Sequence, residues 1–455
     1  MQRPSLPLRH GARLCPLALA CALLLGCSSV PKAPPAPPSP PAHWLHGSPE
    51  APRATPVVDA QLAQLQQRAL LANLDLARAA LRLQAARSRQ LDGDRRWLQE
   101  ASLNAQDTRQ RPGANTQTFS AQASLSYELD LFGRLAAGAR QRSLDVSSQE
   151  RDAQALRTQL LADVAQAYWQ WQGLQAQAPL QAERLEDLQA VLAMTRISVA
   201  AGRLAPVEVD KVATQIQEQQ LQLQQRQREQ QQLQLRLGVL LGEGGAGPQL
   251  QPVPLPDVAL AGLPLAEPAR VLELRADVAQ ARIQVDQALA GWAEARGQRY
   301  PRLTFSAAYG TQGTRPGDWL DNPLRSLVSK LTVPLVQWQH LAAQEDQAQL
   351  KLQEQALALR DTLNKAVLDV EGALLDYRGL REELAVQQQR VQEVLRTERD
   401  AQRRRELGMV SGLDWRQVRA ARLQAELATL QLQQRIWVQQ TTLHRALGLP
   451  LQAGN

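Results

Sequence analysis

Residues 118–131 show a strict alternation of apolar and polar side chains. Odd-numbered positions are apolar and even-numbered positions are polar or charged: Phe119, Ala121, Ala123, Leu125, Tyr127, Leu129 and Leu131 alternate with Thr118, Ser120, Gln122, Ser124, Ser126, Glu128 and Asp130. This period of two predicts a β-strand with one apolar face and one hydrated face. A strand of 14 residues is long enough to cross a bilayer at a tilt. The alternative is a soluble hairpin packed on helices.

Weaker patterns predict three further strands. Residues 97–106 are the expected partner of the first strand, although Gln99 falls on the apolar face. Alternating apolar positions mark one later strand and the end of another: Leu303, Phe305, Ala307 and Tyr309, then Leu331, Val333 and Leu335. Four strands cannot close a barrel, and an open sheet edge in lipid leaves backbone groups unpaired. Because three chains would supply about twelve strands, enough for a water-filled lumen, the strand count predicts a homo-oligomer.

Long helical patterns fill most of the remaining chain. Residues 135–200 and 337–407 are each predicted to form one helix, the first about 100 Å long at about 1.5 Å per residue. Residues 57–92 and 207–241 are about half that length, so two short helices laid end to end match one long helix. Pro179 is expected to kink the first long helix. Seam positions three and four residues apart predict antiparallel coiled-coil packing, as in Leu413, Gln417, Ala420, Leu423, Leu427 and Leu430.

The chain repeats its own pattern about 206 residues later. The matched positions are Asp163-Val164 with Asp369-Val370, Ala167 with Ala373, Gly202 with Gly408, Glu208 with Asp414, and Leu241-Gly242 with Leu447-Gly448. Such self-similarity indicates a duplicated supersecondary unit. We expect structural repeats at residues 57–242 and 267–449, joined by a linker at 243–266 and followed by a tail at 450–455. Each repeat would contain a helix, a β-hairpin, a long helix and a return helix.

A matched glycine turn follows each long helix. The two turns are Gly202-Arg203-Leu204-Ala205-Pro206 and Gly408-Met409-Val410-Ser411-Gly412. Glycine ends helices in the left-handed conformation, and Pro206 suits the first turn of the returning helix. Ser411 followed by Asp414 resembles a capping pair. These turns are expected at the ends of the molecule farthest from the strands.

The first residues predict export and a lipid anchor. Residues 14–25 form an apolar run that is too short for a membrane span and is preceded by three arginines, Arg3, Arg9 and Arg13. The run ends at Gly26-Cys27, so residues 1–26 resemble a bacterial lipoprotein signal, after which Cys27 carries N-acyl and S-diacylglycerol lipid. The alternative is an ordinary signal with a chance cysteine. Residues 27–56, which begin with a proline-rich stretch, are expected to act as an extended tether.

Composition and charge argue against several functions. The formal charge of +7 falls to about +4 once the signal arginines are removed, and the other arginines are interleaved with acids. The Arg403-Arg404-Arg405 run is interpreted as a solvated helix face, and export also argues against a nucleic-acid partner. Histidines are scattered, and no His/Cys cluster has metal-ligand spacing, so neither an enzyme nor a metal site is expected. A G-x-G-x-x-G at residues 242–247 follows a helix instead of a strand, so no dinucleotide site is expected.

Together these motifs resemble the TolC-like outer-membrane factors of efflux pumps, in the NodT/OprM-type branch of efflux lipoproteins. The resemblance rests on the Cys27 signal, on Tyr127-Glu128-Leu129-Asp130-Leu131-Phe132-Gly133-Arg134, on the glycine turns with an acid six residues later, and on the closing Leu-Gly pairs. Two further segments resemble the opening and the hairpin entry of the family's second repeat: Arg275-Ala276-Asp277-Val278 and Tyr300-Pro301-Arg302-Leu303-Thr304. The resemblance covers residues 57–450.

The resemblance implies an α+β membrane protein. It would be a homotrimer with a twelve-stranded outer-membrane β-barrel, four strands per chain, continued by a periplasmic α-helical coiled-coil tunnel. The tips would dock to a periplasmic adaptor (membrane fusion) protein and an inner-membrane efflux pump, and small toxic compounds would leave through the duct. No cofactor is expected apart from the covalent lipid. The alternatives are the exit duct of a type I protein secretion system and a pore-less lipid-anchored scaffold, although a scaffold needs no lipid-facing strand.

The resemblance also implies a gate at the tips. In the family, polar and charged residues just after each reversal narrow the closed tunnel, and the matching positions are Glu208, Asp414 and Gln417. Three copies of each carboxylate on one axis would repel one another and favour cations. Alternatively, both acids only complement the positive N-terminal ends of the return helices. The expected adaptor-docking residues, each of which could also belong to a plain helical turn, are Gly202, Arg203, Leu204, Gly408, Met409 and Val410.

Overall fold

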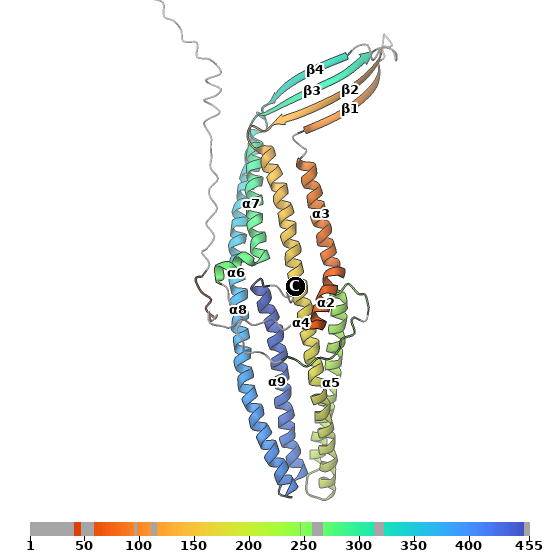
Figure 1. The fold of residues 1–455 in the computed structure, drawn as a ribbon, viewed down its shortest axis with the longest axis vertical. Coiled ribbons are helices and arrows are strands. Elements are labelled where there is room, and N and C mark those ends of the chain that lie inside the picture. The colour runs from red at the N-terminus through yellow and green to blue at the C-terminus, as the bar shows by residue number, and fades with distance from the viewer. Residues whose placement is uncertain are drawn as a thin grey trace, which may run out of the picture.

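The computed structural model describes residues 41–46, 59–94, 98–110, 116–245, 247–256, 267–313 and 323–449. Within these residues a sheet of four strands caps one end of a long body of helices (Figure 1). In chain order the elements are α2 (Ala60–Ala72), α3 (Leu74–Asp94), β1 (Leu98–Gln110), β2 (Thr116–Leu129), α4 (Arg134–Ala200), α5 (Val207–Leu240), α6 (Pro268–Leu274), α7 (Ala276–Gly297), β3 (Arg302–Gly313), β4 (Pro323–Thr332), α8 (Trp338–Glu406) and α9 (Gly412–Ala446). The predicted signal, Cys27 and the tail at 450–455 lie outside the described residues.

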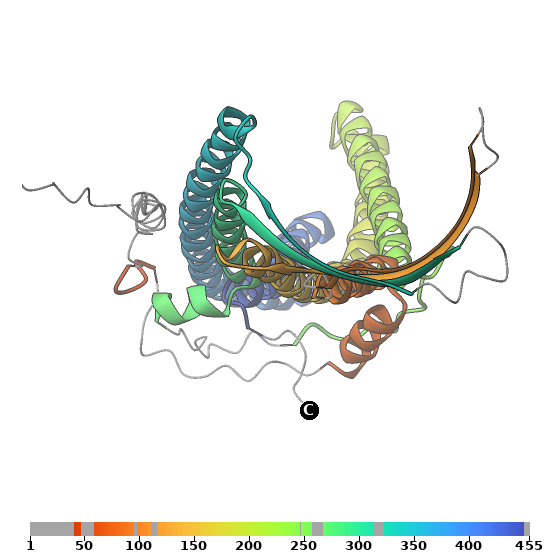
Figure 2. The same ribbon diagram turned by 90° about the horizontal axis from the view of Figure 1, so that it is seen from above.

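The strands form one antiparallel sheet in the order β1-β2-β3-β4. Its register places Leu125 opposite Ala307 and Ala307 opposite Leu327, so the apolar positions share one face. That face is open in the single chain, where Leu327 is 81% exposed. On the opposite face the hydroxyls of Ser126 and Ser306 lie 3.2 Å apart. Figure 2 shows that the sheet is strongly curved, and β1 and β4 leave both edges unpaired within the described chain.

The predicted strands are present, but two of their ends differ from the prediction. β2 ends at Leu129, and the N–H of Leu131 donates back to the carbonyl of Leu129 at 3.0 Å in a turn. β4 ends at Thr332, so Leu335 lies in the connection to α8 and not in a strand. Pro334 has no N–H with which to continue the hydrogen-bond ladder. Local backbone chemistry therefore shortens both strands relative to the apolar pattern.

The two long helices run nearly the full length of the helical body. α4 contains 67 residues and α8 contains 69, which is about 100 Å each at about 1.5 Å per residue. In Figure 1 the shorter helices lie beside them in end-to-end pairs, with α3 above α5 along α4, and α7 above α9 between α4 and α8. Pro179 lies inside α4 without ending it. The expected match of one long helix to two short ones is therefore present.

The prediction of one helix at residues 57–92 was wrong, because Asn73 divides it into α2 and α3. Asn73 has an extended backbone, and its side-chain oxygen accepts from the N–H groups of Asp75 at 2.9 Å and Leu76 at 3.1 Å. Its side-chain amide donates to the carbonyl of Leu240, at the end of α5, at 2.9 Å. Asn73 therefore ends α2, caps the N-terminus of α3, and bonds to the last residue of α5.

A matching break separates α6 from α7. Arg275, which is nearly buried there, pairs with Asp277 at 2.7 Å and with Asp369 of α8 at 3.0 Å. Its guanidinium also donates to the carbonyl of Ala446, at the end of α9, at 3.0 Å. In both repeats, a polar side chain at a helix break thus bonds to the carbonyl end of the return helix.

Apolar packing is strong at the level of these two helix breaks, which we call the waist of the molecule. One buried cluster contains Tyr377 and Ile436, and another contains Trp169 and Trp437, whose rings stack 4.9 Å apart between α4 and α9. The Tyr168 hydroxyl donates to Asp59, just before α2, at 2.8 Å. These contacts therefore hold together the helices that meet at the waist, between the sheet and the tips.

We predict that Gly242→Ala destabilises the protein, whereas Gly244→Ala does not. Gly242 has φ of 70°, and a Cβ there would lie 2.2 Å from the carbonyl oxygen of Ala72. The left-handed conformation alone costs a non-glycine residue about 1–2 kcal/mol, and the clash adds to that. Gly244 has open space around it, so it is the matched control. Thermal unfolding measures both variants, and equal melting temperatures would contradict the prediction.

Candidate functional site

The candidate site is the pair of helical tips, where α4 turns into α5 and α8 turns into α9. Gly202 and Gly408 have φ of 71° and 73°. The N–H groups of Gly202 and Arg203 donate to the carbonyls of Val199 and Ser198, both at 2.9 Å, and the second tip repeats this pattern. Each long helix therefore ends in the same glycine motif, which satisfies its last carbonyls.

The predicted gate residues lie in the first two turns of the return helices. The Ser411 hydroxyl accepts from the N–H of Asp414 at 3.1 Å and donates to the Asp414 carboxylate at 2.7 Å. Glu208 pairs with Lys211 at 2.7 Å. Asp414 and Gln417 are exposed, and Glu208 is half-buried. Both acids thus stand at the positive ends of α5 and α9, where they favour the helical arrangement electrostatically.

The predicted docking residues form an exposed surface that is partly apolar. Met409 is 73% exposed, and the neighbouring Leu407 is 71% exposed. Gly202, Arg203 and Gly408 are also exposed, while Leu204 and Val410 are half-buried. Large apolar side chains left open at a tip are the kind of feature that marks contact with another protein.

A ladder of ion pairs joins α9 to α4 behind the tips. Asp187 of α4 is buried and forms ion pairs with Arg416 and with Arg419, the latter at 3.1 Å. One turn away, Glu183 accepts from Arg419 at 2.7 Å. Because arginines repeat every three residues on α9 and the acids are four apart on α4, each set lies on one helix face.

The ladder also reaches α8. Arg422 bonds to Glu183, to Glu398 of α8 at 3.0 Å, and to Glu426 within α9 at 2.8 Å. Burial alone would raise the pKa of Glu183, but the hydrogen bonds and charges of Arg419 and Arg422 hold that pKa below its ordinary value. The carboxylate is therefore kept ionised, and three helices are tied together by one charge network.

Trp415 lies under the arginines at the start of α9. The Arg405 guanidinium lies 4.4 Å from the centre of the Trp415 ring, and that of Arg419 lies 5.4 Å from it. Such stacking is worth about 0.5–1 kcal/mol at exposed sites. The solvated-face interpretation of the arginine run therefore fits Arg403 and Arg404, which are exposed, while Arg405 also links the end of α8 to α9.

Sequence reasoning missed this ladder. Its signal was present as three arginines at three-residue spacing, Arg416, Arg419 and Arg422, opposite two acids four residues apart. Since the two sets lie about 230 residues apart in the sequence, only the packing of α9 on α4 could pair them.

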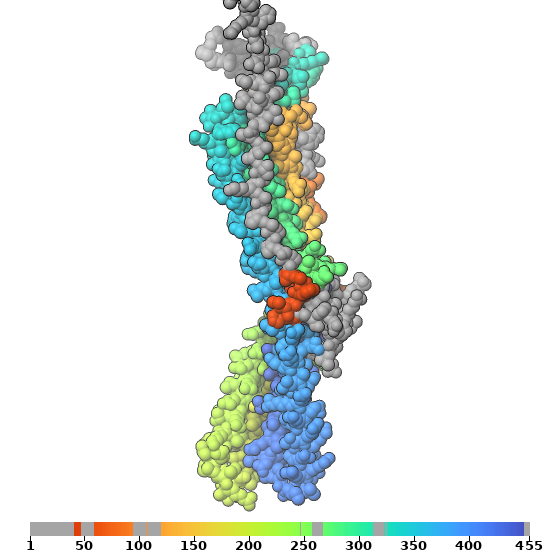
Figure 3. Space-filling view, turned by 90° about the vertical axis from the view of Figure 1, so that its left-hand side faces the viewer, coloured from red at the N-terminus to blue at the C-terminus, as the bar shows by residue number. Residues whose placement is uncertain are grey.

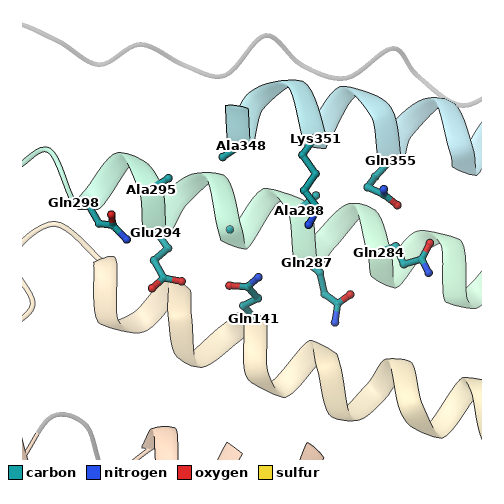
Figure 4. A pocket seen from close by; sticks show the side chains of 11 residues that line it. Gln141, Gln284, Gln287, Ala288, Glu294, Ala295, Gln298, Ala348, Lys351 and Gln355 are labelled. Carbon is teal, nitrogen blue, oxygen red and sulfur yellow. The ribbon is translucent and has the colours of Figure 1, made fainter. Parts of the chain in front are cut away.

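A groove of about 490 Å³ near the sheet is lined by side chains of α4, α7 and α8 (Figure 4). Its polar lining is mostly amide, with one acid, Glu294, and one lysine, Lys351. The amides are those of Gln141, Gln284, Gln287, Gln298 and Gln355. Within the described ranges, no His, Cys, Asp or Glu side chains gather in a group able to hold a metal ion. None of the described helices combines the length and apolarity of a membrane span.

Several characterised proteins are similar to this chain. The toluene efflux pump outer membrane protein TtgC of Pseudomonas putida is 27% identical over 86% of this chain and 83% of its own. The cation efflux system protein CusC of Escherichia coli is 25% identical over 86% of this chain and 87% of its own.

Solved structures share the fold. The outer-membrane channel OprN matches with a TM-score of 0.82 and 22% identity, over 93% of this chain and 99% of its own. The open-state MtrE outer membrane channel of Neisseria gonorrhoeae matches with a TM-score of 0.76 and 22% identity, over 92% of this chain and 98% of its own. These two channels therefore have the same fold as this chain, including the sheet and the long helices.

The family described as "Outer membrane efflux protein" matches this chain in two stretches, residues 65–243 and 268–449. The two stretches correspond to the two halves in which α4 and α8 are the long helices. The chain therefore belongs to the outer membrane efflux protein family.

Proposed function

We propose that this outer-membrane efflux component works as a lipid-anchored homotrimeric duct, gated and docked at its helical tips. The observation that carries the proposal is an amphipathic sheet, with both edges unpaired among the described residues, at one end of about 100 Å of helix. Unpaired backbone groups cost several kcal/mol each in lipid, so each edge needs a strand from another chain. Three chains of four strands supply about twelve, enough for a lumen.

Cys27 supplies the anchor in this proposal. It follows an apolar signal, and the acylated chain would hold the sheet end at the outer membrane, with the helices in the periplasm. One acyl chain binds membranes only marginally, whereas several chains anchor stably, which suits a triacylated cysteine that assists a barrel.

The cargo is a set of small compounds chosen by the inner-membrane pump. Relatives of this chain are named for toluene efflux, pyoverdine export and cation efflux. These cargoes share little chemistry, which argues that the duct itself selects weakly. They are also small, which favours efflux over protein secretion as the use of the duct.

The gate combines the ladder with the acids at the tips. While Asp187 and Glu183 hold Arg416, Arg419 and Arg422, α9 stays against α4 and the tip stays narrow. An adaptor that docks at the exposed tip residues, around Gly202 and Gly408, would shift α9 and release these pairs. Glu208 and Asp414, three copies of each, would then line the entrance and favour cations.

The trimer is expected to conduct ions in planar lipid bilayers and to prefer cations. The combined Glu208→Gln and Asp414→Asn changes should lower the cation-to-anion permeability ratio several-fold, because they neutralise the acids at the entrance. Asp210→Asn is the control, since Asp210 is an exposed acid on the same turn of α5. Reversal potentials in a salt gradient give the ratio. A stable trimer without conductance would contradict the channel itself.

Breaking the ladder should open the duct. Removing one partner of a buried ion pair costs about 3–5 kcal/mol, and Asp187 is a buried partner of two arginines. Asp187→Asn is therefore expected to raise the ratio of open to closed channels, and with it the mean conductance, at least about tenfold, since about 1.4 kcal/mol corresponds to tenfold in an equilibrium constant. Glu186→Gln, next to it on the exposed face, should behave as wild type. Unchanged conductance in a folded Asp187→Asn trimer would remove the ladder from the gate.

Charged bulk at Gly408 should abolish efflux and leave the trimer in the membrane. A Cβ on Gly408 would meet nothing within 4 Å, so a larger side chain points into the space that a docked adaptor needs. Gly408→Asn is the control for backbone strain, because asparagine tolerates the left-handed conformation that Gly408 adopts. Drug susceptibility of a deletion strain carrying each variant measures efflux, and native gels measure the trimer. Loss of the trimer in Gly408→Glu would point to folding and not to docking.

A further inference from the structure

A short N-terminal segment, residues 41–46, packs against the middle of the helical body. Figure 3 shows it on the surface of the waist, beside α6 and α8. Trp44 is only 8% exposed and belongs to the buried cluster that contains Tyr377 and Ile436. The neighbouring Leu45 is exposed. The buried side chain of Trp44 therefore holds the segment against the apolar core.

A single carboxylate holds the same segment. Glu371 of α8 accepts from the N–H of Leu45 at 2.7 Å, from the N–H of His46 at 3.1 Å, and bonds to Nδ1 of His46 at 2.9 Å. Its side chain is mostly buried. Hydrogen bonds to an ionised acceptor are about twice as strong as neutral ones. We call Trp44, Leu45, His46 and Glu371 the clamp.

The position of the clamp can be compared with the chain length that precedes it. Glu371 lies 33 residues into α8 from Trp338, the residue at the sheet end, which corresponds to about 50 Å. Cys27 lies 17 residues before Trp44, and those residues can span at most about 61 Å, or about 53 Å as polyproline II helix. The maximum reach therefore exceeds the distance along α8 by only about 10 Å.

Without the clamp, the reach of the chain from Cys27 would not be close to the distance along α8. The next described residue after the segment is Asp59, which is 32 residues from Cys27 and allows a reach of about 115 Å. A lipid on such a chain could sit anywhere along the body. Packing of Trp44 and bonding of Glu371 cut the free length roughly in half.

We propose that the clamp makes the chain from Cys27 to Trp44 a ruler, that is, a link of fixed maximum length that stops the acylated Cys27 from lying much farther from the clamp than the sheet end does. The proposal rests on the lipidation proposed above. A lipid in the leaflet and a closed clamp are compatible only when the membrane surface lies no more than about 10 Å beyond the sheet end. The clamp thus sets an upper limit on the distance between the lipid anchor and the helical body.

Hydrogen–deuterium exchange of the peptide containing Leu45 and His46, in trimers held in lipid nanodiscs, tests the ruler. Both amides should be protected in the wild-type protein. Deleting residues 33–38 leaves 11 residues with a reach of at most about 40 Å, which is shorter than the distance of about 50 Å along α8. Exchange in the acylated deletion variant should rise at least about tenfold, whereas an insertion of six residues should leave it unchanged.

Removing the lipid gives the decisive comparison. The same deletion with Cys27→Ser, exported by a non-lipoprotein signal, should regain full protection because nothing then pulls on the clamp. Protection that persists in the acylated, trimeric deletion variant would overturn the ruler. Mass spectrometry that finds no acyl group on Cys27 would overturn it as well.

Variants of the clamp separate it from the duct. Glu371→Gln should raise exchange at the two amides about tenfold or more, while Glu382→Gln, an exposed acid on the same helix, should not. Conductance should be retained in both, since neither residue lies at the tips. If the wild-type trimer fails to conduct but its exchange follows the pattern above, the duct is wrong and the ruler stands. Unchanged exchange in Glu371→Gln would remove Glu371 from the clamp.

Discussion

Backbone hydrogen bonding at the sheet edges is the constraint on which the rest of the structure depends. A bilayer offers no water to unpaired N–H and C=O groups, and the described part of one chain provides strands β1 to β4 with both edges open. In the proposed duct, closure comes from other copies of the chain, and each copy then continues from a curved wall of strands into a wall of helices. The duplication of the chain meets this demand, because every pair of strands is followed by one long helix and one return helix.

Because the helices differ in length, the short helices end beside long ones, and side chains at the waist bond to the short helices' last carbonyls. Where a short helix ends beside a long one that continues, its last carbonyls need partners. Asn73 supplies one to the end of α5, and Arg275 supplies one to the end of α9. The same two residues interrupt their own helices, so a single side chain both ends one element and receives the next. The aromatic stack of Trp169 on Trp437 then fixes the two halves to each other.

Local patterns predicted those features that are decided locally. The period of two in β2, the length of α4 and the left-handed Gly202 and Gly408 all depend on neighbours within a few residues. The missed features depend on distant partners. Asn73 breaks a helix in concert with a carbonyl of α5, and Glu183 finds Arg419 only after α9 has packed on α4. The roles of Glu208, Asp414, Gln417 and the docking residues depend on other chains, so they stay predictions.

In the proposed gate, the order of the arginines along α9 has a kinetic consequence. Arg416 is nearest the tip, Arg419 follows one turn later, and Arg422 is the most distant, and each shares an acid with the next. A force applied at the tip can therefore peel the helix away one pair at a time, and a released arginine can be replaced by water before the next one yields. The free-energy barrier to the movement of α9 is then set by a single ion pair, although all the pairs together hold the resting state. A helix held by such a series of ion pairs can be tightly bound at equilibrium and still move quickly when a force is applied.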